Sequence, residues 1–288
     1  MNAGSRFSEV IKQAAEENGF STNNFQSLTG GDINDVFLIE TTTSEKLVIK
    51  INDSNKYPGM FEAERAGLDE LRKAEVIDVP KGLFTGEVQD QSYLILQYID
   101  TSNKVSDFWE VFGEQMAALH RTTSKDFGFE TDNYIGSLPQ YNKSCDSASE
   151  FYISQRLEPQ LEMAKNAGYN LGNIKNFLKN ASELIPNEPP TLVHGDLWGG
   201  NFIVNSKGLP CLIDPAVAYA PREMDLAMMK LFGGFDTQLF KSYNSHFPLE
   251  PGFEERVPLW QLYYLLVHLN IFGSSYKNSV EKIIRRYS

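Results

Sequence analysis

The segment 192–214 limits what this chain can fold into more than any other part of the sequence. It opens on a short apolar stretch, continues as His-Gly-Asp-Leu-Trp-Gly-Gly-Asn over 194–201, and reaches Asp214 after a second short apolar stretch. One loop thus carries a carboxylate and an amide, and a second carboxylate follows the next short strand. Phosphoryl transfer from a magnesium nucleotide requires such groups, because a base must sit beside the attacking hydroxyl and oxygen ligands must hold the metal. Asp196 fits the base, and Asn201 with Asp214 fits the metal site.

Simpler interpretations of these side chains exist. Asp and Asn are common in turns, and Asp214, which precedes Pro215, could start one. Their joint spacing favours the catalytic arrangement over separate turns. His194 could serve as a base or a metal ligand, but the sequence shows no close thiol or carboxylate ligand pattern around its four histidines, so zinc is not expected. We expect His194 to brace the loop.

Trp198 stands between the expected base and the expected metal amide, so it must lie at or near the site. Its indole could form a wall for a sugar or amine substrate, or it could pack beneath the loop, and the sequence leaves both interpretations open. Downstream, residues 222–228 begin a predicted helix. Asp225 in that helix is predicted to be a buried polar brace for the catalytic loop rather than a reactant.

The first part of the chain carries a hairpin pattern beside two glycines. Residues 35–40 and 47–51 are apolar, β-branched runs joined by a Thr-rich, charged connection, which predicts two paired strands. Gly30 and Gly31 precede the first strand. A glycine pair is weak evidence by itself, because it is often only a turn. Beside a strand pair it could also expose backbone N–H groups to phosphates with no Cβ in the way.

Lys50 lies within the second of these strands, among apolar neighbours, where an unpaired ammonium would be costly to bury. It should therefore have an anionic partner. Glu64, in the next predicted helix over 61–73, can pair with it while the ammonium also reaches nucleotide phosphates. Glu62 competes, but it lies about 200° around the helix from Glu64, so only one of the two can face the strand. A surface lysine on an edge strand is the alternative interpretation of Lys50.

Charge and cysteine content limit the partners and the compartment. A net charge of -12 and a pI near 4.9 argue against nucleic-acid and anionic-membrane binding, since both depend on basic surface. Cys145 and Cys211 lie far apart, which indicates incidental thiols in a reducing compartment. No stretch approaches the roughly 18 apolar residues of a membrane span. We expect a cytoplasmic protein with no nucleic acid and no membrane as partner.

Periodic patterns divide the chain into two parts. Apolar residues at helical spacing predict an opening amphipathic helix around 7–15, and residues 92–98 are typical of a buried strand. Three later segments also have apolar residues at helical spacing: 108–119, 174–184 and 259–266. Strands enclosing one helix are thus followed by a mainly helical remainder. The boundary is expected between Tyr98 and Ser106.

Together these motifs resemble the fructosamine kinase (ketosamine-3-kinase) family, from about Phe7 to Tyr287. The segments that carry the resemblance are 30–31, 48–50, 61–64, 128–136, 194–201, 213–216, 225–235 and 272–276. The resemblance implies an α+β, two-lobed, protein-kinase-like fold of the aminoglycoside phosphotransferase type. Its N-terminal nucleotide-binding lobe, 1–98, would be a small antiparallel β-sheet with one helix. A mainly helical catalytic and substrate lobe would span 99–288.

The same resemblance implies an activity. ATP would lie in the cleft with Mg²⁺, and its γ-phosphate would pass to the sugar 3-hydroxyl of a ketosamine, the rearranged adduct of a sugar with an amine. The product would decompose and free the amine, so the role would be deglycation. Fructosamines, ribulosamines and erythrulosamines are all candidate acceptors, with the last two favoured for a bacterial member. The sequence does not distinguish a free ketosamine substrate from a protein-bound one, or a monomer from a homodimer.

Residue roles follow from the motif match. The acceptor proton would pass to Asp196, the metal would bind Asn201 and Asp214, and Trp198 is the candidate acceptor contact. The residues implied to bind the nucleotide are Gly30, Gly31, Lys50, Glu64, Gln97, Tyr98 and Ile99. The last three would offer backbone groups to adenine at the end of a strand.

Two positions depart from the family pattern. Asp32 stands where many relatives carry a cysteine, so thiol-based control at the glycine-rich loop is not expected. Pro221 replaces a histidine and removes a hydrogen-bonding side chain expected near the substrate side, which could shift the preferred ketosamine.

Two other functions remain as alternatives. One is a kinase of another small amine alcohol, such as an aminoglycoside or a choline-like compound. The other is a catalytically inactive kinase-like binding module. The joint presence of Lys50, Asp196, Asn201 and Asp214 argues against the inactive module, because a binding module has no chemical need for a base and a metal pair.

Overall fold

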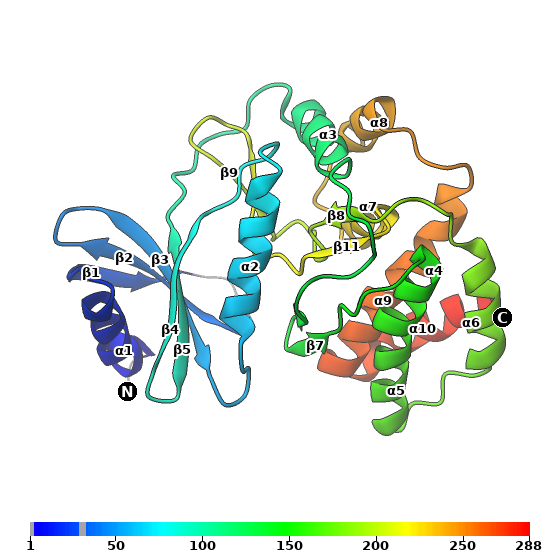
Figure 1. Ribbon diagram of the computed structural model, residues 1–288, viewed down its shortest axis with the longest axis horizontal. Coiled ribbons are helices and arrows are strands. Elements are labelled where there is room, and N and C mark those ends of the chain that lie inside the picture. Colours follow the sequence, from blue (N-terminus) through cyan, green and yellow to red (C-terminus); the bar gives the residue numbers. More distant parts are fainter. Residues whose placement is uncertain (1–2, 29–32) are drawn as a thin grey trace.

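The computed structural model describes residues 3–28 and 33–288, which form two lobes (Figure 1). The N-terminal lobe is built on an antiparallel sheet of five strands in the order β1-β2-β3-β5-β4. These strands are β1 Thr22–Ser27, β2 Asp35–Thr41, β3 Lys46–Asp53, β4 Gly82–Val88 and β5 Gln91–Gln97. The predicted hairpin is confirmed as β2–β3, with Val36 opposite Lys50. Gly30, Gly31 and Asp32 lie outside the described residues.

Two helices cover the two faces of this sheet (Figure 1). Successive side chains of a strand point to opposite faces. Ile49 of β3 therefore packs in one core with Phe7 and Ile11 of α1 Ala3–Glu17, while Lys50 points to the face covered by α2 Met60–Lys73. The predicted opening helix is confirmed as α1. The resemblance implied one helix in this lobe and the structure has two among the residues it describes, because the apolar stripe of α1 also needs a partner and finds it on the outer face of the sheet.

The C-terminal lobe is mainly helical. Its helices are α3 Phe108–Leu119, α4 Ala148–Phe151, the π-helical η1 Tyr152–Leu157, α5 Glu158–Asn166, α6 Ile174–Leu184, α7 Glu223–Leu231, α8 Thr237–His246, α9 Phe253–Phe272, the 3-10 helix η2 Ser274–Tyr276 and α10 Lys277–Arg286. The three predicted helical segments are confirmed as α3, α6 and α9. Helix α9 runs through the core of the lobe, where Trp260, Leu262 and Leu266 are buried.

Short strand pairs of the C-terminal lobe carry the loops that matter for chemistry. They are β6 Asn133–Ile135 with β7 Leu138–Gln140, β8 Thr191–Val193 with β11 Ala218–Ala220, and β9 Phe202–Val204 with β10 Pro210–Leu212. Hairpin β6–β7 also reaches the other lobe, because the Tyr134 hydroxyl donates to the carbonyl oxygen of Pro58 at 2.9 Å. The chain passes from β5 to α3 after Gln97. The lobe boundary at residues 98 and 99 stays a prediction.

None of the helices in the described ranges, 3–28 and 33–288, has the length and apolar character needed to cross a membrane.

Candidate active site

Lys50 holds two carboxylates from different parts of the chain. Its Nζ donates to Glu64 Oε1 at 2.7 Å and to Asp214 Oδ1 at 2.9 Å, and the lysine is 4% exposed. Burial lowers the pKa of Lys50, but the charges of Asp214 and Glu64 outweigh it and raise the pKa above its ordinary value. The predicted pairing with Glu64 is confirmed, and Glu62 is exposed. The alternative interpretation of Lys50 as a surface residue is therefore wrong.

The pair also affects Glu64. Burial and the neighbouring charge of Asp214 raise the pKa of Glu64, while Lys50 opposes them. A single buried ammonium thus balances two carboxylates, one from α2 and one from the segment after β10. Asp214 remains 45% exposed, so it can take a further cationic partner from solvent.

The loop after β8 is braced by Asp225 of α7, as predicted. Asp225 is fully buried and accepts the backbone N–H of His194 at 2.7 Å and that of Gly195 at 2.9 Å. Its Oδ2 also lies 3.3 Å from His120 Nε2. Burial raises the pKa of Asp225, but the hydrogen bond and charge of His120, with the backbone N–H of Gly195, bring it below its ordinary value. The carboxylate therefore stays ionised and fixes the loop backbone.

His194 is a structural residue, as expected. Its Nε2 lies 2.9 Å from the carbonyl oxygen of Ile213, and its Nδ1 accepts the backbone N–H of Asp196 at 3.3 Å. This pattern needs the neutral tautomer with hydrogen on Nε2. Burial lowers the pKa of His194, which also favours the neutral ring. The imidazole thereby connects the loop of Asp196 to Ile213, the residue that precedes Asp214.

Gly195 allows the two loops to approach. Its φ is 84°, in the left-handed region, and a Cβ there would overlap the carbonyl oxygen of Ala216. The backbone N–H of Ala216 donates to the carbonyl of His194 at 2.9 Å. Any side chain at Gly195 would separate Asp196 from Asp214, so the glycine of the motif has a steric cause.

Asp196, Asn201 and Asp214 meet at one point, as the spacing predicted. Asn201 Nδ2 donates to the Asp196 carbonyl oxygen at 2.7 Å and to Asp196 Oδ2 at 3.2 Å. That leaves Asn201 Oδ1 for another partner. Burial and the charge of Asp214 raise the pKa of Asp196 well above its ordinary value. A cation nearby would offset this repulsion between the carboxylates.

This donor set fits magnesium. Mg²⁺ prefers oxygen ligands, and proteins usually supply one or two carboxylates while phosphates and water complete the octahedron. Asn201 Oδ1 and the exposed carboxylate of Asp214 are oxygen donors of that kind. Asp214 itself has φ 55°, an uncommon conformation for a non-glycine residue, of the kind that recurs at functional sites.

Trp198 lies at the surface of the site rather than beneath it. It is 44% exposed, and a Cβ on Gly200 would overlap its indole, so the ring lies across that glycine. Gly199 in turn approaches the backbone of Gly234, which follows α7. The two glycines of the motif are thus required for different reasons: Gly200 leaves room for the indole of Trp198, and Gly199 leaves room for the loop that follows α7. The interpretation of Trp198 as a wall for the acceptor is favoured.

These residues share one cavity of about 850 Å³. Of the predicted site residues, those that line it are Lys50, Glu64, Asp196, Trp198, Asn201 and Asp214. Gln97, Tyr98 and Ile99 are not among its lining residues, and Gly30 with Gly31 lie outside the described residues. The cavity therefore unites the residues expected to handle phosphate, metal and acceptor.

A second wall of the cavity was missed from the sequence. Tyr264, Val267, His268 and Ile271 line it at the spacing i, i+3, i+4, i+7, so they form one face of α9. Phe272, which is 52% exposed, continues this wall at its rim. One feature of the sequence could have predicted this wall: helix α9 has no distinct polar face. A long helix that is apolar all round must be covered everywhere or line a cavity.

His268 is the polar member of this wall. Its Nδ1 lies 2.8 Å from the carbonyl oxygen of Tyr264, which makes that nitrogen the donor and leaves Nε2 as an acceptor. Burial lowers the pKa of His268 and keeps the ring neutral. Phe232 packs against it with the two rings tilted by 39° and their centroids 4.8 Å apart.

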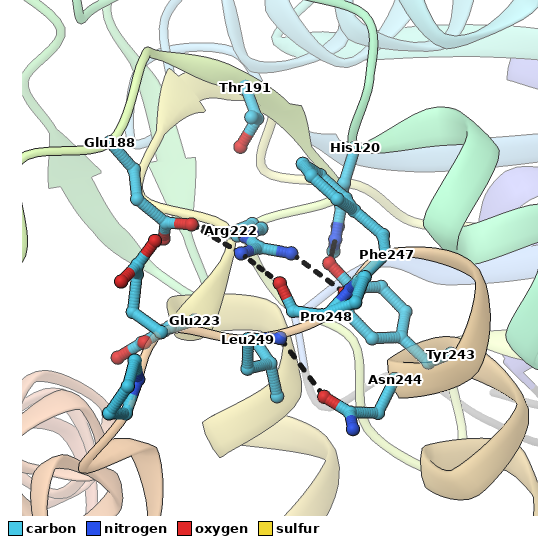
Figure 2. Close-up of polar contacts among 12 residues, drawn as sticks. His120, Glu188, Thr191, Arg222, Glu223, Tyr243, Asn244, Phe247, Pro248 and Leu249 are labelled. Carbon is cyan, nitrogen blue, oxygen red and sulfur yellow. Dashed lines mark hydrogen bonds and ion pairs between the residues drawn. The ribbon is translucent and has the colours of Figure 1, made fainter.

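Pro221 does not lie where the family comparison suggested. Residues 219–223 are absent from the cavity lining, and Arg222 points into a buried network (Figure 2). Arg222 Nε donates to Glu188 Oε1 at 2.8 Å, and its amino groups donate to the carbonyls of Phe247 and Pro248. This network fixes the start of α7 and hence Asp225. Pro221 therefore does not contact the cavity where the acceptor is expected to bind.

Comparison with known proteins agrees with this geometry. The family model for fructosamine kinase matches residues 5–288. A probable ketoamine kinase of Synechocystis sp. is 33% identical over 99% of this chain and 98% of its own length. The crystal structure of a Haemophilus somnus protein assigned as a fructosamine-3-kinase is 30% identical, with a TM-score of 0.87 over 96% of each chain.

A thermostable mutant of an aminoglycoside phosphotransferase has a TM-score of 0.62 at 15% identity, over 95% of this chain and 97% of its own. At that identity the likeness concerns the fold alone, and it confirms the two-lobed, protein-kinase-like α+β class. The family model and the ketoamine kinase go further, since both cover nearly all of the sequence. This chain belongs to the fructosamine kinase family.

Proposed function

We propose that this protein is an ATP-dependent kinase that phosphorylates the sugar 3-hydroxyl of ketosamines. The observation that carries the proposal is the meeting of Lys50, Asp196, Asn201 and Asp214 in one cavity beside an aromatic wall. Family membership supports ATP as the phosphate donor. The 3-phosphate product would decompose and free the amine, so the reaction would reverse glycation of a small amine or a protein.

Each residue then has a defined task. Asp196 accepts the proton of the attacking hydroxyl, since its partly buried carboxylate has a raised pKa, the usual way a protein moves a carboxyl toward the range of a general base. Lys50, held by Glu64, donates to phosphate oxygens. Asn201 and Asp214 would hold Mg²⁺, which neutralises charge on the transferred phosphoryl group.

The adenine and glycine-loop contacts remain part of this proposal. Backbone groups of Gln97, Tyr98 and Ile99, at and just after the end of β5, would meet adenine. Gly30 and Gly31 would cover the phosphates. We also propose the division into a nucleotide lobe, 1–98, and a substrate lobe, 99–288.

The acceptor wall supports a ketosamine over an aminoglycoside. Among the described residues that line the cavity, only Glu64, Asp196 and Asp214 carry carboxylates, and each already has a task. A polycationic aminoglycoside requires further carboxylates to balance its ammonium groups. A ketosamine has one amine and several hydroxyls, and it suits aromatic rings with a few polar atoms. The exposed rim at Trp198 and Phe272 leaves room for the amine part to leave the cavity.

The test is magnesium-dependent release of ADP with three acceptors: a ribulosamine, an erythrulosamine and a fructosamine of lysine. Wild-type protein should turn over at least one of them, and NMR should locate the phosphate on the sugar 3-hydroxyl. Asp196→Asn should lower kcat by about 10²–10⁴-fold, the usual contribution of a general base, while nucleotide affinity stays within about twofold. Rapid ADP release with an aminoglycoside but none with a ketosamine would contradict the proposal.

A further inference from the structure

Tyr264 carries a hydroxyl that has no hydrogen-bond partner among residues 3–28 and 33–288. The side chain is 1% exposed, and its hydroxyl oxygen is buried with no hydrogen bond. Among the described residues, Tyr264 is the one that both has a buried side-chain polar atom without a hydrogen bond and lines the cavity. An unpaired buried hydroxyl is costly, and phenylalanine would fill the same space without that cost. The unpaired hydroxyl of Tyr264 therefore indicates a functional role.

The neighbouring tyrosine shows that the fold can satisfy such a group. Tyr263 is equally buried, and its hydroxyl donates to Gln140 Oε1 at 2.7 Å. The two rings contact each other with centroids 5.1 Å apart. One tyrosine of the pair thus has a protein partner, and the one in the cavity wall has none.

The position of Tyr264 relates it to the reacting end of the cavity. It shares one face of α9 with Val267 and His268, and this face lines the same cavity as Asp196 and Asn201. The charge of Asp196 is among the influences that, after burial itself, raise the pKa of the Tyr264 phenol well above its ordinary value. The phenol is therefore neutral, so its hydroxyl can both donate and accept a hydrogen bond, as a sugar hydroxyl also can.

The orientation of a bound ketosamine indicates which sugar oxygen could contact the Tyr264 hydroxyl. Its 3-hydroxyl must face Asp196, and its amine end, beyond C2, must leave by the exposed rim where Trp198 and Phe272 lie. The 4-hydroxyl side then points toward the buried wall. We propose, resting on the ketosamine kinase function above, that the Tyr264 hydroxyl hydrogen-bonds the 4-hydroxyl of the bound sugar and so positions the 3-hydroxyl for transfer.

Contact requires a small movement. The Tyr264 oxygen is closed to solvent in the free cavity, so a side chain of the wall must shift as the sugar enters. Binding then converts an unpaired buried group into a paired one. A ligand without the matching hydroxyl leaves the group unpaired, which gives the site a means of rejecting it.

The test is Tyr264→Phe beside Tyr263→Phe as the matched control. For Tyr264→Phe we expect the KM of the ketosamine to rise about tenfold, the value of one ordinary hydrogen bond, with unchanged nucleotide affinity. Its Tm should equal or exceed that of the wild type, because the lost hydroxyl had no partner. Tyr263→Phe should show the reverse: a lower Tm and an unchanged KM. An unchanged ketosamine KM in Tyr264→Phe would overturn the proposal.

A 4-deoxy ketosamine identifies the oxygen. Wild type should lose about tenfold in kcat/KM on this substrate relative to its parent, and Tyr264→Phe should lose almost nothing, because the pair is already broken. Equal losses in both enzymes would reject the assigned contact. If the wild type turns over no ketosamine at all, the proposed function itself fails, whereas normal turnover by both enzymes rejects only the role of Tyr264.

Discussion

Replacing Asp225 by asparagine should destabilise the protein through the catalytic loop. Its two oxygens accept two backbone N–H groups, from His194 and Gly195, and also contact His120. Asparagine keeps one acceptor oxygen and turns an N–H group toward the remaining donor. Each hydrogen bond to a charged group is worth about 1.5–3 kcal/mol, and an orphaned buried donor costs about 1–3 kcal/mol. We expect a loss of about 3–5 kcal/mol in the free energy of unfolding.

The assay is urea and thermal unfolding at pH 7. A loss of that size corresponds to a Tm lower by roughly 6–10 °C in a chain of this length. Asp107→Asn is the control, because Asp107 is exposed and makes no side-chain bond at the start of α3. That change should stay within about 0.5 kcal/mol of wild type.

Acid provides a second check on Asp225. Its pKa is lower in the folded protein than in the unfolded chain, so its contribution is complete above the unfolded value of about 4 and is lost as pH falls through the folded value. The gap in stability between wild type and Asp225→Asn should therefore be constant from pH 7 to about pH 5 and shrink below about pH 4. A gap under about 1 kcal/mol at pH 7, or one that widens in acid, would refute the brace.

Two further variants address the metal and the acceptor. Asp214→Asn should raise the Mg²⁺ concentration needed for half-maximal turnover at least about tenfold, because it removes a charged oxygen ligand. EDTA should abolish the activity of the wild type until Mg²⁺ is restored. An unchanged Mg²⁺ requirement in Asp214→Asn would show that Asp214 is not a metal ligand. Trp198→Ala should raise the acceptor KM about tenfold and leave the ATP KM unchanged, as expected for loss of an aromatic wall. Unchanged acceptor kinetics would restore the interpretation of Trp198 as packing.

Edge strands show where sequence patterns stop being informative. Strands β1 and β4 occupy the two edges of the sheet and were not predicted. In β1 every residue is at least partly exposed, so alternation of apolar and polar residues is weak, and β4 contains two glycines. Strands β2, β3 and β5 lie inside the sheet and were predicted. The middle residues of β3 and β5 are mostly buried on both faces, and β2 buries alternate residues, so all three carry apolar or β-branched side chains.

The polar residues divide in a similar way. The sequence predicted that Lys50 pairs with Glu64, because a buried ammonium within a strand must have a nearby carboxylate, and the helix period excluded Glu62. It did not predict that Asp214 would share the same lysine from 164 residues away. Such a contact follows from how the two lobes meet, and no local period encodes it.

The sequence by itself predicted that Asp196, Asn201 and Asp214 lie together and that Asp225 braces their loop, because these features depend on short spacings and on the costs of burying charge. The same arguments predicted the hairpin and the main helices from their apolar periods. Only the tertiary structure decided which face of α9 lines the cavity, which tyrosine of 263 and 264 keeps its hydroxyl unpaired, and where Trp198 lies. Those facts depend on packing between elements far apart in the chain, where the environment of each side chain is set by its neighbours in space.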